Sequence, residues 1–452
     1  MVRQAPVSAG LVLLGAAVAA LALPGVVPAQ TPGSPVVPTA PTIAGKHLGV
    51  ATCSSAVCHG QVTPSQKYDV LMNEYVTWSH HDAHAKAYAA LNSTKSRAMA
   101  AKLRIGDAAT AKICLDCHAD NVPAQMRGDK FTLTDGIGCE ACHGGAERWL
   151  TTHTSKNATY RDNISRGMYP TADLRPRADL CLSCHYGTAD KFATHRIMAA
   201  GHPRLSFEMA TFLTDQPPHY RVDDDYRRRK PTYGGTQIWA YGQLAATLRE
   251  LDALQGPRID NSAAFPELAL FNCYGCHMSS MRRTDWGHRI LDVEAEPGSV
   301  PVSDGYLGMA WIIARQIEPT TAPTLLKLSQ SLLAASASNR QQIAAQSQQL
   351  TPVIAHLRDL AGSRAWTRAD ERQLLNMMLA VGASGQYRDY IDAEQAVMGI
   401  DGLLIELGLA TRHRQSLDGV YKLVQNDEAY DPDKVVSALR DLQKELEQDG
   451  GV

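Results

Sequence analysis

Apolar residues recur with a helical period in the last part of the chain. After Asp431-Pro432, apolar side chains stand at i, i+4, i+7 and i+11, which places them on one face of a helix. They are Val435, Leu439, Leu442 and Leu446. Because aspartate is a good N-cap and proline suits the first helical position, we predict that a final helix begins here.

Thr351-Pro352 has the same form and precedes three further apolar residues on one helical face. These residues are Val353, Leu357 and Leu360. From residue 301 onward the chain contains no cysteine and only two histidines, His356 and His413, which we interpret as structural. The pattern predicts an all-α helical domain over residues 301–448. It leaves open whether this domain docks a partner or pairs two copies of the chain as a homo-oligomer.

One long apolar run lies near the N-terminus. It covers residues 11–27, follows Arg3, is broken by Pro24 and ends in small residues before Ala29. These features predict a signal peptide over residues 1–29, cleaved near Ala29, so the mature protein is expected to be exported and to lack a transmembrane segment. An uncleaved anchor is the alternative, although the run is short and rich in alanine and glycine for a spanning helix. A Pro/Thr-rich linker over residues 30–46 follows.

Composition and charge exclude some functions. The formal net charge is -2, and the one dense basic run, residues 227–230, follows three aspartates at 223–225 with one residue between them. We interpret this run as a solvated loop, and it gives no reason to expect binding to nucleic acid. The chain has only six Phe and six Trp, so large aromatic side chains for a core are scarce. Something other than side chains is therefore expected to fill part of the interior.

All ten cysteines fall in five short clusters, and each cluster ends in a histidine. Four clusters have the form C-x-x-C-H, whereas the first, "CSSAVCH", has four residues between its cysteines. The cysteines are, in pairs, Cys53 and Cys58, Cys114 and Cys117, Cys139 and Cys142, Cys181 and Cys184, and Cys273 and Cys276. The histidines that follow them are His59, His118, His143, His185 and His277.

Covalent haem explains these clusters best. Disulfides and structural zinc also use closely spaced cysteines, but neither requires a histidine directly after every second cysteine. In a c-type haem site two thiols add to the porphyrin vinyl groups, and the next residue ligates the iron. We therefore predict five covalently bound haem c groups. In the first cluster the two extra residues can form a loop, because only Cys58 and His59 must be neighbours.

The sixth ligand of each iron distinguishes an electron carrier from an enzyme. Eleven histidines lie outside the clusters, and nine of them precede residue 300, so enough are present to close all five irons. Methionine is the other common axial ligand. Met198, Met278 and Met281 lie in suitable regions, but nothing distinguishes them from core residues.

The spacing of several motifs resembles the tetrahaem cytochrome c-554 family, also called the cytochrome c-552/4 domain. The matching pieces are Trp78, "HAKAYAAL" from His84, "DGIGCEACHGG" at residues 135–145, and His153, ten residues after His143. The resemblance covers residues 50 to about 190. It implies a mostly helical shell around closely stacked haems, electron transfer in the periplasm, and roles for His84 and His153 as distal ligands of haems attached elsewhere in the chain.

Two features depart from the family. The first cluster has a longer gap, and the chain continues into a fifth cluster that the tetrahaem pattern lacks. The remaining distal candidates, from the residues alone, are His195, His202 and His288. His195 and His202 share one face if their segment is helical, although Pro203 favours an end to any helix there. His219 is a weaker candidate, and His80 and His81 are alternatives to His84.

We therefore predict a mainly α protein with a pentahaem cytochrome c domain over residues 47–300 and a haem-free helical domain after it. The expected function is electron transfer among periplasmic or membrane-associated redox proteins. The alternative is a multihaem oxidoreductase that acts on a small nitrogen or sulfur compound at an open-face haem. The cluster from Cys114 to His118 is where such an open iron is expected.

Overall fold

The computed structural model describes residues 45–67, 70–260, 266–277, 289–291, 300–336 and 340–450. The described residues fall within one compact unit, Pro38–Val452. The predicted signal peptide, most of the predicted linker, Met278, Met281 and His288 lie outside the described residues. None of the described helices has both the length and the apolar character needed to cross a lipid bilayer.

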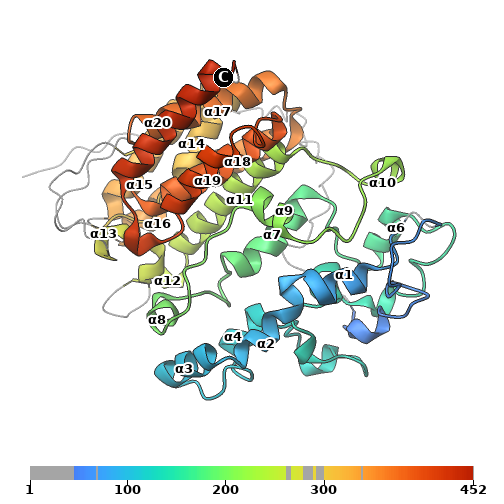
Figure 1. The fold of residues 1–452 in the computed structure, drawn as a ribbon. Coiled ribbons are helices and arrows are strands. Elements are labelled where there is room, and N and C mark those ends of the chain that lie inside the picture. The colour runs from blue at the N-terminus through green and yellow to red at the C-terminus, as the bar shows by residue number, and fades with distance from the viewer. Residues whose placement is uncertain are drawn as a thin grey trace, which may run out of the picture. The chain divides into compact units, whose positions relative to one another are not determined.

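The fold is mainly α, as predicted (Figure 1). In the described part of the chain the β structure consists of isolated bridges between His47 and Arg127 and between Phe271 and Val302. The helices before residue 235 are short: α1 Glu74–His81, α2 Ala87–Leu91, α3 Thr94–Leu103, α4 Lys112–His118, α5 Cys139–His143, α6 Tyr160–Ser165, α7 Leu174–His185, α8 His195–Ala199, α9 Met209–Asp215 and α10 Asp224–Arg229.

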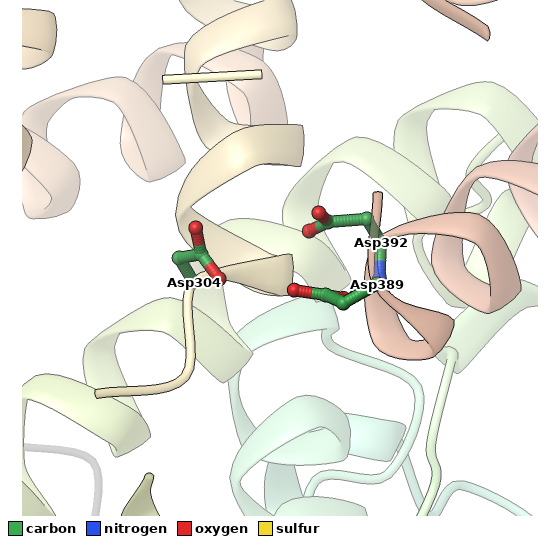
Figure 2. A group of neighbouring side chains, drawn as sticks. All are labelled: Asp304, Asp389 and Asp392. Carbon is green, nitrogen blue, oxygen red and sulfur yellow. The ribbon is translucent and has the colours of Figure 1, made fainter. Parts of the chain in front are cut away.

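Further helices follow, of which two have only four residues and the others have ten or more. They are α11 Gly235–Gln255, α12 Pro257–Asp260, α13 Tyr274–His277, α14 Gly305–Ile317, α15 Ala322–Ser336, α16 Arg340–Ser363, α17 Arg368–Ala383, α18 Tyr390–Glu406, α19 Arg414–Leu423 and α20 Pro432–Gln448. Helices α14 and α18 begin after Asp304 and Asp389, respectively (Figure 2).

One large apolar core joins these later helices. Helix α11 packs against α14, α16 and α18, while α15 packs on α16 and α17 on α20. The core begins at Trp239 and ends at Leu446, and many of its leucines and isoleucines are fully buried. This core contains side chains from before and after residue 300. The predicted domain boundary at residue 300 stays a prediction.

The predicted final helix is confirmed. Asp431 caps α20, its side chain accepts a hydrogen bond from the backbone N–H of Asp433, and Pro432 is the first helical residue. The four predicted apolar residues of this helix are buried. The cap satisfies a free N–H while the apolar face packs against α17, so local and tertiary signals agree.

The predicted helix start at Thr351-Pro352 is wrong, because α16 runs through this pair from Arg340 to Ser363. The Thr351 hydroxyl donates to the carbonyl oxygen of Ser347 at 2.9 Å, as a residue inside a helix does. A proline in a helix interior costs about 3 kcal/mol. The helix continues because it buries one apolar face on both sides of the proline. This face includes Leu350, Ile354, Leu357 and Ala361.

The basic run at 227–230 is also not a loop, since most of it belongs to α10. The Asp223 carboxylate caps this helix by accepting the N–H of Tyr226 at 2.9 Å. Asp224 and Asp225 then pair with the arginines three and four positions later. The same aspartates that suggested a solvated loop therefore start and support a short, exposed helix.

Candidate haem-binding site

Four of the five cysteine clusters form the last turn of a helix. Helices α4, α5, α7 and α13 each end at the cluster histidine. In a helix, residues at i, i+3 and i+4 lie on one face. The two-residue gap therefore presents two thiols and one imidazole on the same side of a single turn, as attachment to one haem requires.

The first cluster has a different local structure. A short 3-10 turn, Val50–Thr52, leads into Cys53, and the backbone N–H of His59 donates to the carbonyl oxygen of Cys53 at 3.2 Å. The residues between form a loop whose outermost side chain, Val57, is 81% exposed. Gly60 lets the loop close, because a Cβ at this position would lie 1.9 Å from the Ser54 carbonyl oxygen. The expected bulge between the two cysteines is therefore present.

Every cluster histidine faces a second histidine from elsewhere in the chain, with ring centres 6.0 to 6.3 Å apart. Metal–imidazole bonds are about 2.0 Å long, so two imidazoles on opposite sides of one metal ion have ring centres about 6.3 Å apart. The pairs are His59 with His153, His118 with His202, His143 with His219, His185 with His84, and His277 with His195. All five spacings fit an iron held between two imidazoles.

Four of the five predicted distal histidines belong to these pairs: His84, His153, His195 and His202. The fifth, His288, lies outside the described residues, and the partner of His143 is His219, which the sequence ranked as weak. His219 follows two prolines between α9 and α10, far from α5 along the chain. No local spacing connects it to His143. The only signal in the sequence was that each cluster histidine needs a partner and that His219 is one of the histidines outside the clusters.

Three distal histidines are oriented by acceptors at Nδ1. His84 Nδ1 lies 2.8 Å from Asp82 Oδ1, and His202 Nδ1 lies 2.7 Å from the carbonyl oxygen of Pro203. His153 Nδ1 contacts the carbonyl oxygen of Leu150. When Nδ1 donates in this way, Nε2 is left as the free nitrogen, which is the arrangement typical of metal-ligating histidines.

Two cluster histidines have the same arrangement. His118 Nδ1 lies 3.0 Å from the carbonyl oxygen of Ala87, and His59 Nδ1 lies 2.9 Å from Glu74 Oε2. The hydrogen bond to Glu74 raises the pKa of His59, and the bond to Asp82 raises that of His84. Burial alone would raise the pKa of Asp82, but hydrogen bonds from His84 bring it down to about 2. Two histidines thus carry a carboxylate behind the ring, which makes them stronger electron donors.

Burial keeps other members of the pairs neutral, the form in which imidazole binds metal. Burial lowers the pKa of His143 to about 3, and it also lowers the pKa of its partner His219. The same cause acts on His185 and His202. Neutral nitrogen donors at these positions suit an iron ligand and do not suit a cationic surface site.

The remaining histidines that the structure describes face no cluster histidine. His47 is buried against Asp120, with 2.7 Å between Nδ1 and Oδ2. His80 and His81 are exposed and lie beside each other, whereas the ring of His84 faces His185. In the helical region His356 contacts Glu318, and buried His413 lies near two carboxylates of α20 and its C-cap.

Polar contacts connect clusters that are distant in sequence. Glu140, inside the third cluster, accepts the backbone N–H groups of Leu48, Gly49 and Ala146 at 2.7 to 2.8 Å. It thereby fixes the segment that leads into the first cluster. Burying a carboxylate in this way is favourable because its oxygens are occupied by donors.

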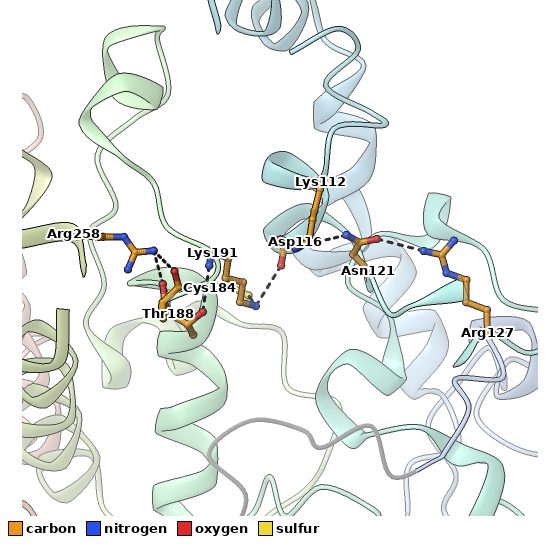
Figure 3. Close-up of polar contacts among 9 residues, drawn as sticks. Lys112, Asp116, Asn121, Arg127, Cys184, Thr188, Lys191 and Arg258 are labelled. Carbon is orange, nitrogen blue, oxygen red and sulfur yellow. Dashed lines mark hydrogen bonds and ion pairs between the residues drawn. The ribbon is translucent and has the colours of Figure 1, made fainter. Parts of the chain in front are cut away.

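Lys191 connects the second and fourth clusters (Figure 3). Its Nζ lies 3.3 Å from the carbonyl oxygen of Asp116 and 3.0 Å from Sγ of Cys184. The Asp116 carboxylate is held in turn by Lys112 and by Asn121. The second and fourth clusters therefore lie close together in space.

Residues 52–144 match the sequence model of the family described as "Cytochrome c554 and c-prime". The match contains the first three clusters and supports a cytochrome of the c554 type with covalently bound haem c. Neither curated proteins nor solved structures gave a match to the chain. The family match and the geometry of the histidine pairs thus point to the same chemistry.

Proposed function

We propose that this protein is an exported pentahaem cytochrome c that transfers electrons between redox partners in the periplasm. The observation that carries the proposal is the set of five histidine pairs, each with the spacing of two ligands on one iron. In this proposal the ten cysteines attach five haems, the cluster histidines are proximal ligands, and the distal ligands are His84, His153, His195, His202 and His219.

Haem supplies one-electron redox chemistry when it is bound. The chain would supply two imidazoles for each iron and hold their rings still. Acceptors at Nδ1 fix the orientation of His59, His84, His118, His153 and His202. Since both sides of each site carry an imidazole, no position is left for a substrate, and fixed ligands minimise rearrangement when an electron arrives.

The pair at the second cluster supports a carrier. Under the enzyme alternative the open iron is expected at Cys114–His118, but the ring of His202 lies 6.3 Å from that of His118 at an angle of 88°. This arrangement favours a carrier over an oxidoreductase that acts on a small nitrogen or sulfur compound. The helical region after residue 300 is then available for a redox partner or for a second copy of the chain.

The proposal is tested on purified holoprotein. Its intact mass should show five added haems, and four would mean that "CSSAVCH" does not attach one. Addition of cyanide, carbon monoxide or nitrite should leave the spectrum of the resting protein unchanged. A high-spin signal that one of these ligands removes, together with catalytic current on an electrode, would replace the carrier function with the enzyme function.

A further inference from the structure

Three buried aspartates meet at the starts of two helices far from the histidine pairs in sequence (Figure 2). Asp304 precedes α14, Asp389 precedes α18, and Asp392 lies in the first turn of α18. Each is at most 1% exposed, and one carboxylate oxygen of each lies within 4.8 Å of the others. Figure 2 shows the two side chains of α18 reaching toward Asp304.

The hydrogen bonds of this cluster are unevenly distributed. Asp389 is satisfied, since Oδ1 accepts the N–H of Asp392 at 2.9 Å and Oδ2 accepts Nδ2 of Asn272 at 2.6 Å. In contrast, both carboxylate oxygens of Asp304 and both of Asp392 are buried without a hydrogen-bond partner. Buried carboxylates are costly when their oxygens lack hydrogen bonds, so these two side chains need an explanation.

Among the described residues the charges near this cluster do not balance. Arg289 supplies one positive charge, with Nη1 3.6 Å from Asp304 and 3.5 Å from Asp389. A fourth carboxylate, Glu250 of α11, is buried close by and has an oxygen without a hydrogen-bond partner. In the described part of the chain one guanidinium thus faces several buried carboxylates, and the deficit is met either by a cation or by protons.

We propose that Asp304, Asp389 and Asp392 bind one calcium ion. Ca²⁺ prefers carboxylate oxygens at about 2.4 Å, so a single ion reaches oxygens as much as about 4.8 Å apart. Mg²⁺ fits less well, because it keeps several waters and needs bonds of about 2.1 Å.

The site lies directly behind the fifth haem cluster. Asn272, which donates to Asp389, is the residue before Cys273. A bound ion would therefore brace the start of this cluster against α14 and α18. This link to the fifth haem rests on the proposed function, whereas binding of the ion does not, so the two are measured separately.

The test uses holoprotein prepared without chelator. Elemental analysis should find about one calcium per chain, and excess EGTA should remove it and lower the unfolding temperature of the helical region. Asp392→Asn should lose at least tenfold in calcium affinity measured by calorimetry. Asp441→Asn, an equivalent change at an exposed aspartate of α20, should bind calcium as the parent does.

Protonation is the competing explanation, since burial raises the pKa of Asp304 to about 7 and that of Asp392 well above its usual range. Holoprotein without calcium, whose unfolding responds neither to calcium nor to EGTA, would overturn the calcium site. If the Asp392→Asn variant still binds one calcium ion, the assignment of the three aspartates as ligands is wrong. If that variant does not fold, the calcium content and the calcium-dependent unfolding of the parent protein still decide whether the protein binds calcium. The potential of the fifth haem, with and without calcium, tests the link separately.

Discussion

The regions before and after α11 are both helical, but they exclude water from their interiors in different ways. The largest core cluster of the described residues lies entirely between Trp239 and Leu446 and consists mainly of leucine, isoleucine and alanine. Before residue 235 the buried apolar side chains form much smaller groups, such as the one around Leu91 and Leu115. Five pairs of histidines take their place there and at α13.

The two regions belong to the same helical class, but they are stabilised in different ways. The later region has enough apolar burial to hold long helices, at roughly 25 cal/mol for each Å² removed from water. The earlier region has helices of five to twelve residues, which are marginal in isolation. Its tertiary structure is expected to depend on the haems that its clusters attach, much as small metal domains depend on their metal.

The largest expected effect separates the two regions. Protein made without the haem-attachment machinery should be unfolded before α11, while α11 and the helices from α14 to α20 stay folded. Limited proteolysis should then leave a protected fragment that begins between α9 and α11, and circular dichroism should show loss of the earlier helices. The holoprotein is the control. Equal protection of both regions would mean that the earlier region folds on its own side chains.

A change at one histidine pair should affect one haem and little else. Replacing His219 by Ala removes the ring opposite His143, so one of five low-spin haems should become high-spin and its potential should rise. Electron paramagnetic resonance measures the spin state, and a redox titration measures the potential. His84→Ala and His153→Ala should act in the same way on the haems of His185 and His59.

His81→Ala is the matched control for these variants. His81 is exposed and lies beside His80 and not beside a cluster histidine, so the spectrum should not change. An unaltered spectrum for His219→Ala as well would remove this residue from the ligand set. The third haem would then need another partner for His143.

Sequence patterns predicted the features that are determined by interactions within a few residues. The Asp431-Pro432 cap and the apolar face after it specify α20, since both act within a few residues. The cluster spacing likewise identifies the turns that present two thiols and a histidine. Thr351-Pro352 shows the limit, because burial of an apolar face across α16 outweighs a cost of about 3 kcal/mol for an interior proline.

The pairing of the histidines was beyond such patterns. His195 and His202 would share one face only if their segment were helical throughout, but α8 ends at Ala199, and the two residues face His277 and His118. Which ring meets which depends on how α8, α4 and α13 pack, and sequence spacing does not encode this. His219 was ranked low for the same reason, as no residue near it indicates its partner.

A change in the apolar core should affect stability without affecting the haems. Leu357 of α16 is fully buried, so Leu357→Ala should lower the free energy of unfolding by about 2–5 kcal/mol through loss of packing and creation of a cavity. Chemical denaturation of the holoprotein measures the effect. Ile405→Ala is the control, since Ile405 is 49% exposed and its replacement should change stability by no more than about 0.5 kcal/mol. Altered haem spectra in Leu357→Ala would show that the two regions are coupled through α11.

The smallest expected effect comes from a single carboxylate in the haem region. Glu74 accepts a hydrogen bond from Nδ1 of His59, and its negative charge increases the electron donation of that ring. Glu74→Gln keeps the size and an acceptor oxygen but removes the charge, so it stabilises the oxidised iron less. If the charged hydrogen bond is worth about 1.4 kcal/mol more than the neutral one, the potential rises by about 60 mV, because a tenfold change corresponds to about 59 mV for one electron. A redox titration followed in the visible spectrum measures the shift.

The control is Asp162→Asn, at an exposed aspartate of α6, which should leave all potentials unchanged. A fall in potential for Glu74→Gln would contradict this role of the carboxylate.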